Sequence, residues 1–159
     1  MLFPSDFVGR PGRTSTPYDV VASTEVTLCT FRKKAFEDLI GRSPRMESRL
    51  LAMTLDELDA AREWMTLLGR KTAREKIASV LLIFARRDAA LSKASMKDGM
   101  AFDLPVTREV IADYLGLTIE TVSRQITALK KQKLILLEGT RHVVVPDIEI
   151  LREESGDDL

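Results

Sequence analysis

The segment 107–129 constrains the fold more than any other part of the sequence, because it meets the requirements of a helix-turn-helix. Thr107 can cap a first helix, Gly116 can end that helix in the left-handed conformation, and Thr118 can cap a second helix. Apolar residues fall on the side of each helix that faces the other: Ile111, Ala112 and Leu115 in the first, and Val122, Ile126 and Leu129 in the second. The segment therefore predicts two short helices that cross closely around a tight turn.

The polar face of the second helix has chemistry suited to base edges in a DNA major groove. Arg124 can donate two hydrogen bonds to guanine, Glu120 can accept one from a cytosine amino group, and Ser123 is small enough to approach a thymine methyl. Further candidate DNA contacts on this helix are Thr118, Thr121 and Lys130. A solvated ion pair between Glu120 and Arg124 is the alternative interpretation. The combination with the caps and the glycine turn favours DNA binding.

A β-hairpin is predicted directly after the second helix. Two apolar runs, 134–137 and 142–145, flank a turn that contains Gly139. A helix-turn-helix followed by such a hairpin is a winged helix. Arg141 beside the turn is a candidate phosphate contact, which positions a protein on DNA without specifying sequence. His142 is expected to be an ordinary hairpin residue rather than a ligand.

Residues 45–70 predict one long helix. A stripe along it has alternating steps of four and three residues, which is the heptad spacing of a two-stranded coiled coil. The candidate dimer-interface residues on this stripe are Leu51, Thr54, Leu58, Ala61, Met65 and Leu68. A second apolar stripe beside it, which includes Trp64 and Leu67, offers surface to another neighbour, so a homodimer is favoured over internal packing alone. Thr72 and Glu75 then fit a capping box that begins the next helix.

The remaining segments complete an α+β, mostly helical chain. Gly, Pro, Ser and Thr dominate residues 9–17 and β-branched residues are frequent over 20–31, which predicts loops and one or two strands. Because so few strands are marginal in water, we expect residues 1–44 to be the remnant of a larger β-roll. We expect a DNA-binding domain over 71–150 and an acidic tail over 151–159.

Composition excludes several classes of function. The 24 basic and 24 acidic residues balance, so the chain as a whole is no general polyanion binder. With one cysteine and one histidine it can form neither an internal disulfide nor a Cys-rich zinc module. We find no nucleophile paired with a base and no phosphate-binding glycine loop, and therefore predict that it is not an enzyme. It has no membrane-length apolar run and no secretory leader, so we expect a cytoplasmic protein.

The order of these parts resembles the cyclic-AMP receptor protein and fumarate-nitrate regulator superfamily over nearly the whole chain. Residues 120–124 are similar to the E-x-x-S-R sequence of the fumarate-nitrate regulator branch, whereas the cyclic-AMP branch has E-x-x-G-R. Residues 58–87 resemble the alphaproteobacterial, oxygen-responsive members. The resemblance implies a homodimeric activator that binds palindromic DNA with TTGAT-type half-sites through Glu120, Ser123 and Arg124. It also implies RNA polymerase as a partner.

The same resemblance implies an oxygen-sensing [4Fe-4S] cluster, held by three cysteines near the N-terminus and one in the β-roll. Cys29 lies in a segment similar to the one that carries the fourth ligand. A cubane needs four such ligands, so we expect no cofactor in this chain, and a cluster only in a longer form. Two alternatives stay open. One is a cyclic-nucleotide-responsive regulator, although residues 9–15 lack an acid to bind ribose. The other is a sensor-less regulator controlled by a partner.

Overall fold

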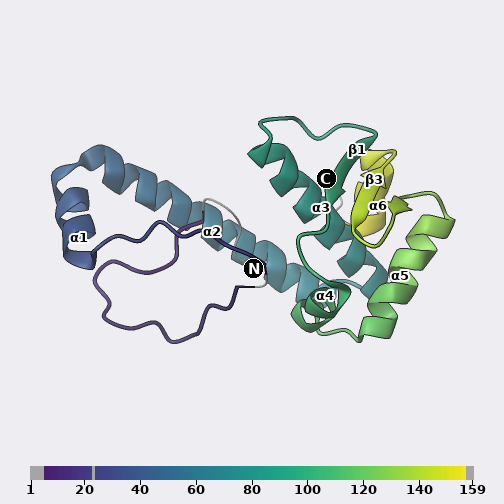
Figure 1. Cartoon of the computed structure of the whole chain (residues 1–159), viewed down its shortest axis with the longest axis horizontal. Coiled ribbons are helices and arrows are strands. Elements are labelled where there is room, and N and C mark those ends of the chain that lie inside the picture. The colour runs from purple at the N-terminus through teal and green to yellow at the C-terminus, as the bar shows by residue number, and fades with distance from the viewer. Residues whose placement is uncertain (1–5, 23, 157–159) are drawn as a thin grey trace. The chain divides into compact units, whose positions relative to one another are not determined.

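The computed structural model describes residues 6–22 and 24–156 of the chain, which divides into the compact units Met1–Glu63 and Trp64–Leu159. The elements, in order (Figure 1), are α1 (Lys33–Arg42), α2 (Pro44–Arg70), α3 (Ala73–Leu91), β1 (Met100–Asp103), α4 (Arg108–Leu115), α5 (Ile119–Lys131), β2 (Leu136–Glu138), β3 (His142–Val145) and α6 (Ile148–Ser155). The chain is mostly helical with one small sheet, as predicted. None of the described helices is long and apolar enough to span a membrane.

The strands predicted over residues 20–31 are not formed by the described residues 20–22 and 24–31, and this corrects that expectation. The described residues 20–22 and 24–31 have no regular secondary structure and are exposed, and Val21 has 82% of its surface accessible. A strand needs a neighbour for its backbone hydrogen bonds, and the described residues of this unit provide none. In their place Phe36 of α1 stacks on Phe7, with ring centroids 5.2 Å apart, and lies 6.0 Å from Phe31.

The core of the second unit is built around α3. Its residues from Ile77 to Ala85 are all buried, including Ser79, so this helix is enclosed on every side. It packs against α6, α5 and β1. The predicted capping box is present at its start: Glu75 N–H donates to Thr72 Oγ1 (3.3 Å), and Thr72 N–H donates to Glu75 Oε2 (2.6 Å). The central helix thus begins where its sequence indicates.

The predicted hairpin is confirmed, and a third strand joins it. The antiparallel sheet has the order β1-β3-β2, so β3 is central and pairs with both neighbours. Gly139 lies in the hairpin turn with φ +66°. His142 on β3 stands opposite Asp103 on β1, and its Nδ1 lies 2.8 Å from Asp103 Oδ1. As expected, His142 is a hairpin residue, and here it links two strands.

Residues 151–155 do not form a free acidic tail, which corrects a second expectation. They belong to α6, which begins where Asp147 Oδ1 accepts a hydrogen bond from Ile150 N–H (3.0 Å). Ile148 and Leu151 are buried, and α6 packs against α3. The charge of this segment hid its apolar spacing, which places one side of a short helix against the core. Residues 157–159 of the expected tail lie outside the described residues.

Candidate nucleic-acid interface

Local hydrogen bonds form the helix-turn-helix where the sequence predicts it. Thr107 Oγ1 accepts from Val110 N–H (3.3 Å) at the start of α4, and Gly116 ends α4 with φ +62°. Thr118 Oγ1 accepts from Thr121 N–H (3.2 Å) at the start of α5. The predicted inward residues are all buried: Ile111, Ala112, Leu115, Val122, Ile126 and Leu129. Their burial fixes which face of α5 points away from the domain.

The exposed face of α5 carries the residues predicted to contact bases. Glu120 and Arg124 are exposed and Ser123 is half-buried between them. Among the described residues no ion pair joins Glu120 to Arg124, so the alternative interpretation of this spacing does not hold here. Hydrogen bonds from its own backbone N–H and from Thr118 hold the pKa of Glu120 below its usual value. Glu120 is therefore a carboxylate acceptor and Arg124 an available donor.

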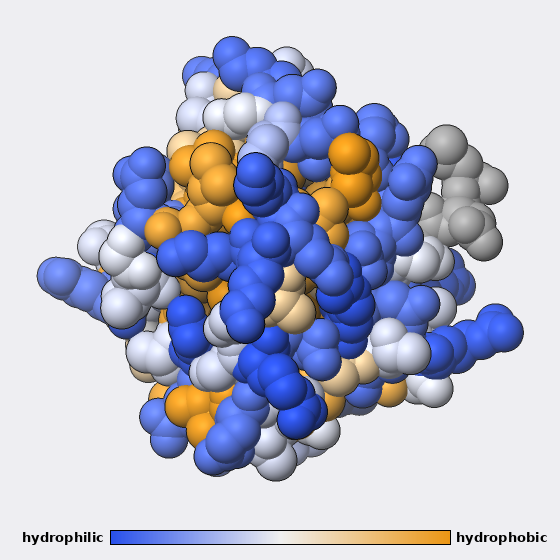
Figure 2. Space-filling view, turned by 90° about the vertical axis from the view of Figure 1, so that its right-hand side faces the viewer, coloured by the Kyte–Doolittle hydropathy of each residue, from blue (hydrophilic) through white to orange (hydrophobic). Residues whose placement is uncertain are grey.

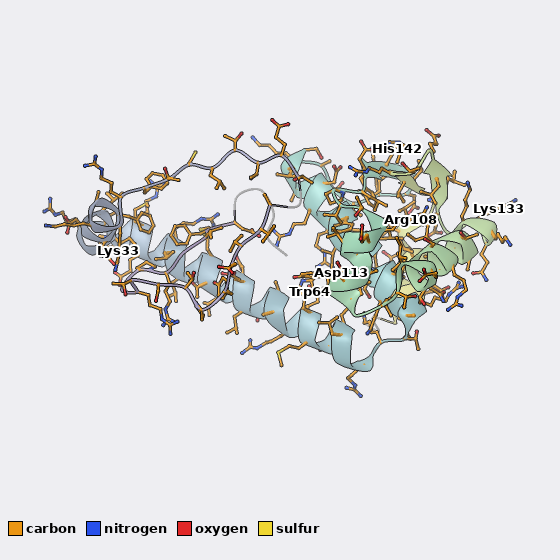
Figure 3. All side chains as sticks on the ribbon, turned by 60° about the horizontal axis from the view of Figure 1, so that its bottom comes forward. Lys33, Trp64, Arg108, Asp113, Lys133 and His142 are labelled. Atoms are coloured by element: carbon orange, nitrogen blue, oxygen red, sulfur yellow. The ribbon has the colours of Figure 1, made fainter. Side chains whose placement is uncertain are left out.

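Two further residues, which the sequence patterns did not indicate, lie beside this face. Arg108 at the start of α4, labelled in Figure 3, donates from Nη1 to Ser123 Oγ (3.4 Å). It therefore brings a positive charge from α4 to the face of α5. Ile119, the first residue of α5, exposes 44% of its surface, and an apolar side chain there suits a thymine methyl. A basic residue after a helix cap carries no distinctive pattern, so only the packing of α4 on α5 reveals Arg108.

The other predicted DNA contacts lie in different parts of the domain. Thr118 and Thr121 are joined by a 3.1 Å hydrogen bond between their hydroxyls at the start of α5. Lys130 is exposed near the other end of α5, ten residues after Glu120 and so about 15 Å along the helix. Arg141 is exposed beside the hairpin turn. The structure thus places Glu120, Ser123 and Arg124 together on one face of α5. Lys130 and Arg141 lie apart from them.

The surface around α5 is largely polar. Figure 2 shows the side of the molecule on which α5 lies in Figure 1, and hydrophilic side chains cover most of it, with separate hydrophobic patches between them. The last turn of α5 adds the exposed side chains of Lys130 and Lys131. A largely polar surface is suited to a polar partner, and Lys130 and Lys131 favour one with negative charge at that end of α5.

Comparison with known proteins agrees with this geometry. Residues 75–154 match the family model of the Crp-like helix-turn-helix domain. The chain belongs to the Crp/Fnr family. It is 63% identical over 158 residues to the transcriptional activator protein FnrL of Cereibacter sphaeroides, covering 99% of this chain and 64% of that protein. It is 45% identical to a probable transcriptional activator of Rhizobium leguminosarum, covering 95% and 61% of the two chains.

A solved structure supports the same assignment. FixK2 from Bradyrhizobium japonicum superposes with a TM-score of 0.69 and 35% identity, covering 80% of this chain and 60% of that one. The two sequence relatives are described as transcriptional activators, one of them as probable, rather than as enzymes, and together with this structure they confirm the resemblance to the fumarate-nitrate regulator branch. The chain spans less than two thirds of the length of the relatives it matches. The family match also extends to residue 154, so the domain includes most of α6.

In this Crp/Fnr family chain the two apolar stripes of α2 have different environments. The second stripe packs within the chain near the end of the helix: Leu67 is 1% exposed, and Trp64 meets Tyr114 of α4 edge to face at 4.7 Å. The predicted dimer residues on the heptad stripe, by contrast, are all exposed: Leu51, Thr54, Leu58, Ala61, Met65 and Leu68. Met65 exposes 74% of its surface. The heptad stripe therefore stays available for a partner.

Cys29 does not fit the iron-sulfur cluster that the family resemblance implies. It is exposed, and no group of three His, Cys, Asp or Glu side chains gathers as a metal site within the described part of the chain. A cubane needs four ligands, usually thiolates, and this sequence contains one cysteine. The residues of this chain therefore cannot hold such a cluster by themselves.

Proposed function

We propose that the chain is a sequence-specific DNA-binding transcriptional activator of the fumarate-nitrate regulator type. The observation that carries this proposal is the grouping of Glu120, Ser123 and Arg124 on the exposed, N-terminal half of α5. Val122, which lies between Glu120 and Ser123, and Ile126, two residues after Arg124, are both buried, and this holds the three polar residues on one outward face. A recognition helix of this kind enters the major groove with its N-terminal residues toward the bases.

In this proposal each polar group has a distinct partner on DNA. Arg124 donates two hydrogen bonds to a guanine, Glu120 accepts from a cytosine amino group, and Ser123 approaches a base or a thymine methyl. Arg108, Lys130 and Arg141 neutralise phosphates, which places the domain without specifying sequence. These contacts are consistent with TTGAT-type half-sites, since such a site presents both G·C and A·T pairs.

The proposal includes a homodimer on a palindromic site. The exposed heptad stripe of α2 supports it, because an apolar seam with this spacing is buried by pairing with a second copy. The dimer would place two recognition helices about one DNA turn apart, roughly 34 Å. A regulator of this type would work in the cytoplasm with RNA polymerase as its partner.

The controlled genes are proposed to be oxygen-responsive or redox-responsive. Relatives that support this include an anaerobic regulatory protein of Pasteurella multocida and the nitrogen fixation regulation protein FixK of Bradyrhizobium diazoefficiens. Because the residues present do not fit a cluster, this chain needs a different source of control. We propose a partner molecule or a longer form that supplies the remaining ligands.

Arg124→Ala tests the assignment at the base-reading face. It should weaken binding to a TTGAT-type palindrome by about 1–3 kcal/mol and remove the preference at one base pair, measured by fluorescence anisotropy with single-base variants of the site. Lys130→Ala is the matched control. It should weaken binding to all sequences equally. The slope of log K against log salt concentration should become less steep by about one. An Arg124→Ala protein with undiminished base preference would contradict the proposed function.

A further inference from the structure

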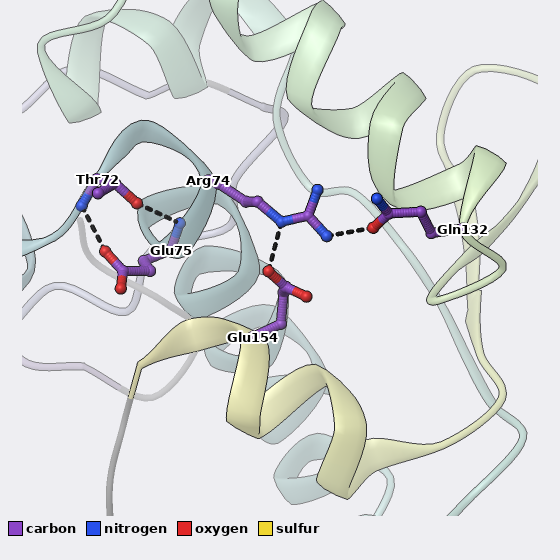
Figure 4. A network of polar contacts seen from close by, with 5 residues as sticks. All are labelled: Thr72, Arg74, Glu75, Gln132 and Glu154. Carbon is purple, nitrogen blue, oxygen red and sulfur yellow. Dashed lines mark hydrogen bonds and ion pairs between the residues drawn. The ribbon is translucent and has the colours of Figure 1, made fainter.

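Arg74 connects three helices that are distant in sequence. It lies in the first turn of α3, and its Nε donates to Glu154 Oε1 on α6 (Figure 4). Its Nη2 donates to Oε1 of Gln132, the residue that caps the C-terminal end of α5. The partners are 80 and 58 residues away along the chain. One guanidinium therefore meets both the closing helix of the domain and the end of the helix that carries the base-reading residues.

We propose that Arg74 is a positioning residue for sequence recognition, which sets the direction of α5 through Gln132 and is itself oriented by Glu154. The inference rests on the proposed function, since it assigns a role in base discrimination to a residue of α3, outside the helix that carries the base-reading residues. In this proposal α6 also takes part in recognition, because its Glu154 carboxylate orients the Arg74 guanidinium.

Glu154 is suited to orient the guanidinium. The ion pair is partly shielded, with 27% of the Arg74 side chain and 28% of the Glu154 side chain accessible. The hydrogen bond between them raises the pKa of Arg74 and lowers that of Glu154, so both remain charged near neutral pH. A guanidinium is a rigid, planar donor fork, so fixing Nε on Glu154 also fixes the direction in which Nη2 points. That direction leads to Gln132.

The end of α5 is a place where a contact can control the tilt of the helix. The 13 residues of α5 span about 20 Å, and the base-reading residues lie in its other half. A small displacement at Gln132 therefore changes the approach of Glu120 and Arg124 to the bases. The first turns of α3 hold α4 in a similar way, because Lys76 Nζ donates to Leu115 O (3.4 Å) at the end of α4. Arg74 and Lys76, two residues apart on α3, thus contact the C-terminal ends of α5 and α4 respectively.

Gln132→Met in the full chain is the decisive variant. It removes the acceptor on α5 while the ion pair of Arg74 with Glu154 stays in place, so the thermal unfolding midpoint should remain that of the parent. The ratio of affinities for the parent palindrome and for a single-base variant of it should fall by about three- to tenfold. If the contact between Arg74 and Gln132 only stabilised the fold, Gln132→Met would lower the amount of active protein and leave this ratio of affinities unchanged.

Two comparisons separate positioning from general charge effects. Glu154→Met should reduce the affinity ratio, whereas Glu153→Met removes the same charge from the exposed side of α6 and should leave the ratio unchanged. In an Arg74→Met background, Gln132→Met should cause no further loss. The inference is overturned if Gln132→Met keeps the parent ratio, or if its loss is undiminished in the Arg74→Met background. A parent chain without any base preference would overturn the proposed function and this inference together.

Discussion

At the scale of single residues, two positive φ angles shape the recognition unit. Gly116 at the end of α4 has φ +62°, and Lys133 after α5 has φ +60°. The glycine is the residue expected at such a position, whereas a lysine accepts it only because its surroundings require it. Beyond Lys133 the chain turns so that Leu134 N–H donates to Leu129 O (3.0 Å) and Ile135 becomes fully buried. The burial of Ile135 thus offsets the strain at Lys133.

Gly116→Ala should lower the free energy of unfolding by about 1 kcal/mol, because a Cβ disfavours the left-handed conformation. A Cβ at Gly116 would meet no atom within 4 Å, so the loss reports backbone strain alone. Gly69→Ala is the matched control, since its Cβ would also meet open space but the residue lies within α2. It should raise the free energy of unfolding by about 0.5–1 kcal/mol. Urea denaturation measures both, and equal effects would contradict the role given to φ.

Lys133→Gly should raise the free energy of unfolding by about 0.5–1 kcal/mol, because glycine removes the strain of a positive φ. Lys131→Gly, two residues earlier, changes the charge equally but lies in the last turn of α5, so it should lower that free energy by up to about 1 kcal/mol. Thermal unfolding followed by circular dichroism distinguishes the two. A loss of stability in both variants would show that the conformation of Lys133 is not strained.

At the scale of secondary-structure elements, α6 joins the core as well as the recognition unit. Leu151 is 0% exposed and packs this short helix against α3. Arg74 adds an ion pair between the two helices, and the pKa of the Glu154 carboxyl is lowered by it. A carboxyl with a lowered pKa in the folded state stabilises that state above its unfolded pKa, and this contribution is lost as the pH falls through the folded pKa.

Glu154→Gln should make the free energy of unfolding less sensitive to a fall in pH. In the parent, the contribution of Glu154 is fully present above about pH 4.3, the unfolded pKa of glutamate, and is lost at lower pH. Because the pair is partly exposed, the difference should be at most about 1 kcal/mol. Urea denaturation near pH 6 and near pH 3 measures it, with Glu153→Gln as the control. An identical loss of stability in the parent and in Glu154→Gln would refute the assignment.

At the scale of the whole molecule, α2 presents an apolar seam that the described residues do not cover. Leu58 and Met65 are exposed on the heptad stripe, whereas Leu67 of the neighbouring stripe is buried. The heptad stripe was the predicted dimer surface, and its exposure in a single chain is what pairing with a second copy requires. The proposed dimer in turn determines how many recognition helices one assembly brings to DNA.

Leu58→Lys should weaken the homodimer, because it places a charge within the proposed seam. Sedimentation equilibrium should give twice the chain mass of 17.8 kDa for the parent and a mass close to one chain for the variant. Ala52→Lys adds the same side chain on another exposed face of α2 and should leave the dimer intact. If Leu58→Lys and the parent have the same mass, the seam is not the dimer interface.

The sequence alone determined the features that depend on neighbours in the chain. The caps at Thr72, Thr107 and Thr118, the turn at Gly116 and the hairpin follow from local hydrogen bonds and from apolar periodicity, and each is present as predicted. The outward face of α5 follows in the same way, because its rotation is set by the apolar stripe on its other side. These features are readable because the residues that create them lie within a few positions of one another.

Only the tertiary structure decided the features that depend on distant partners. Residues 20–31 have strand-forming composition, but without a strand beside them the backbone groups of the described residues 20–22 and 24–31 form no sheet. The acidic segment after residue 147 becomes α6 because α3 offers an apolar surface to Leu151. Arg108 and Arg74 gain their roles from Ser123, Gln132 and Glu154, which packing brings to them from elsewhere in the chain. Such contacts leave no periodic pattern, so their partners become visible only once the helices are packed.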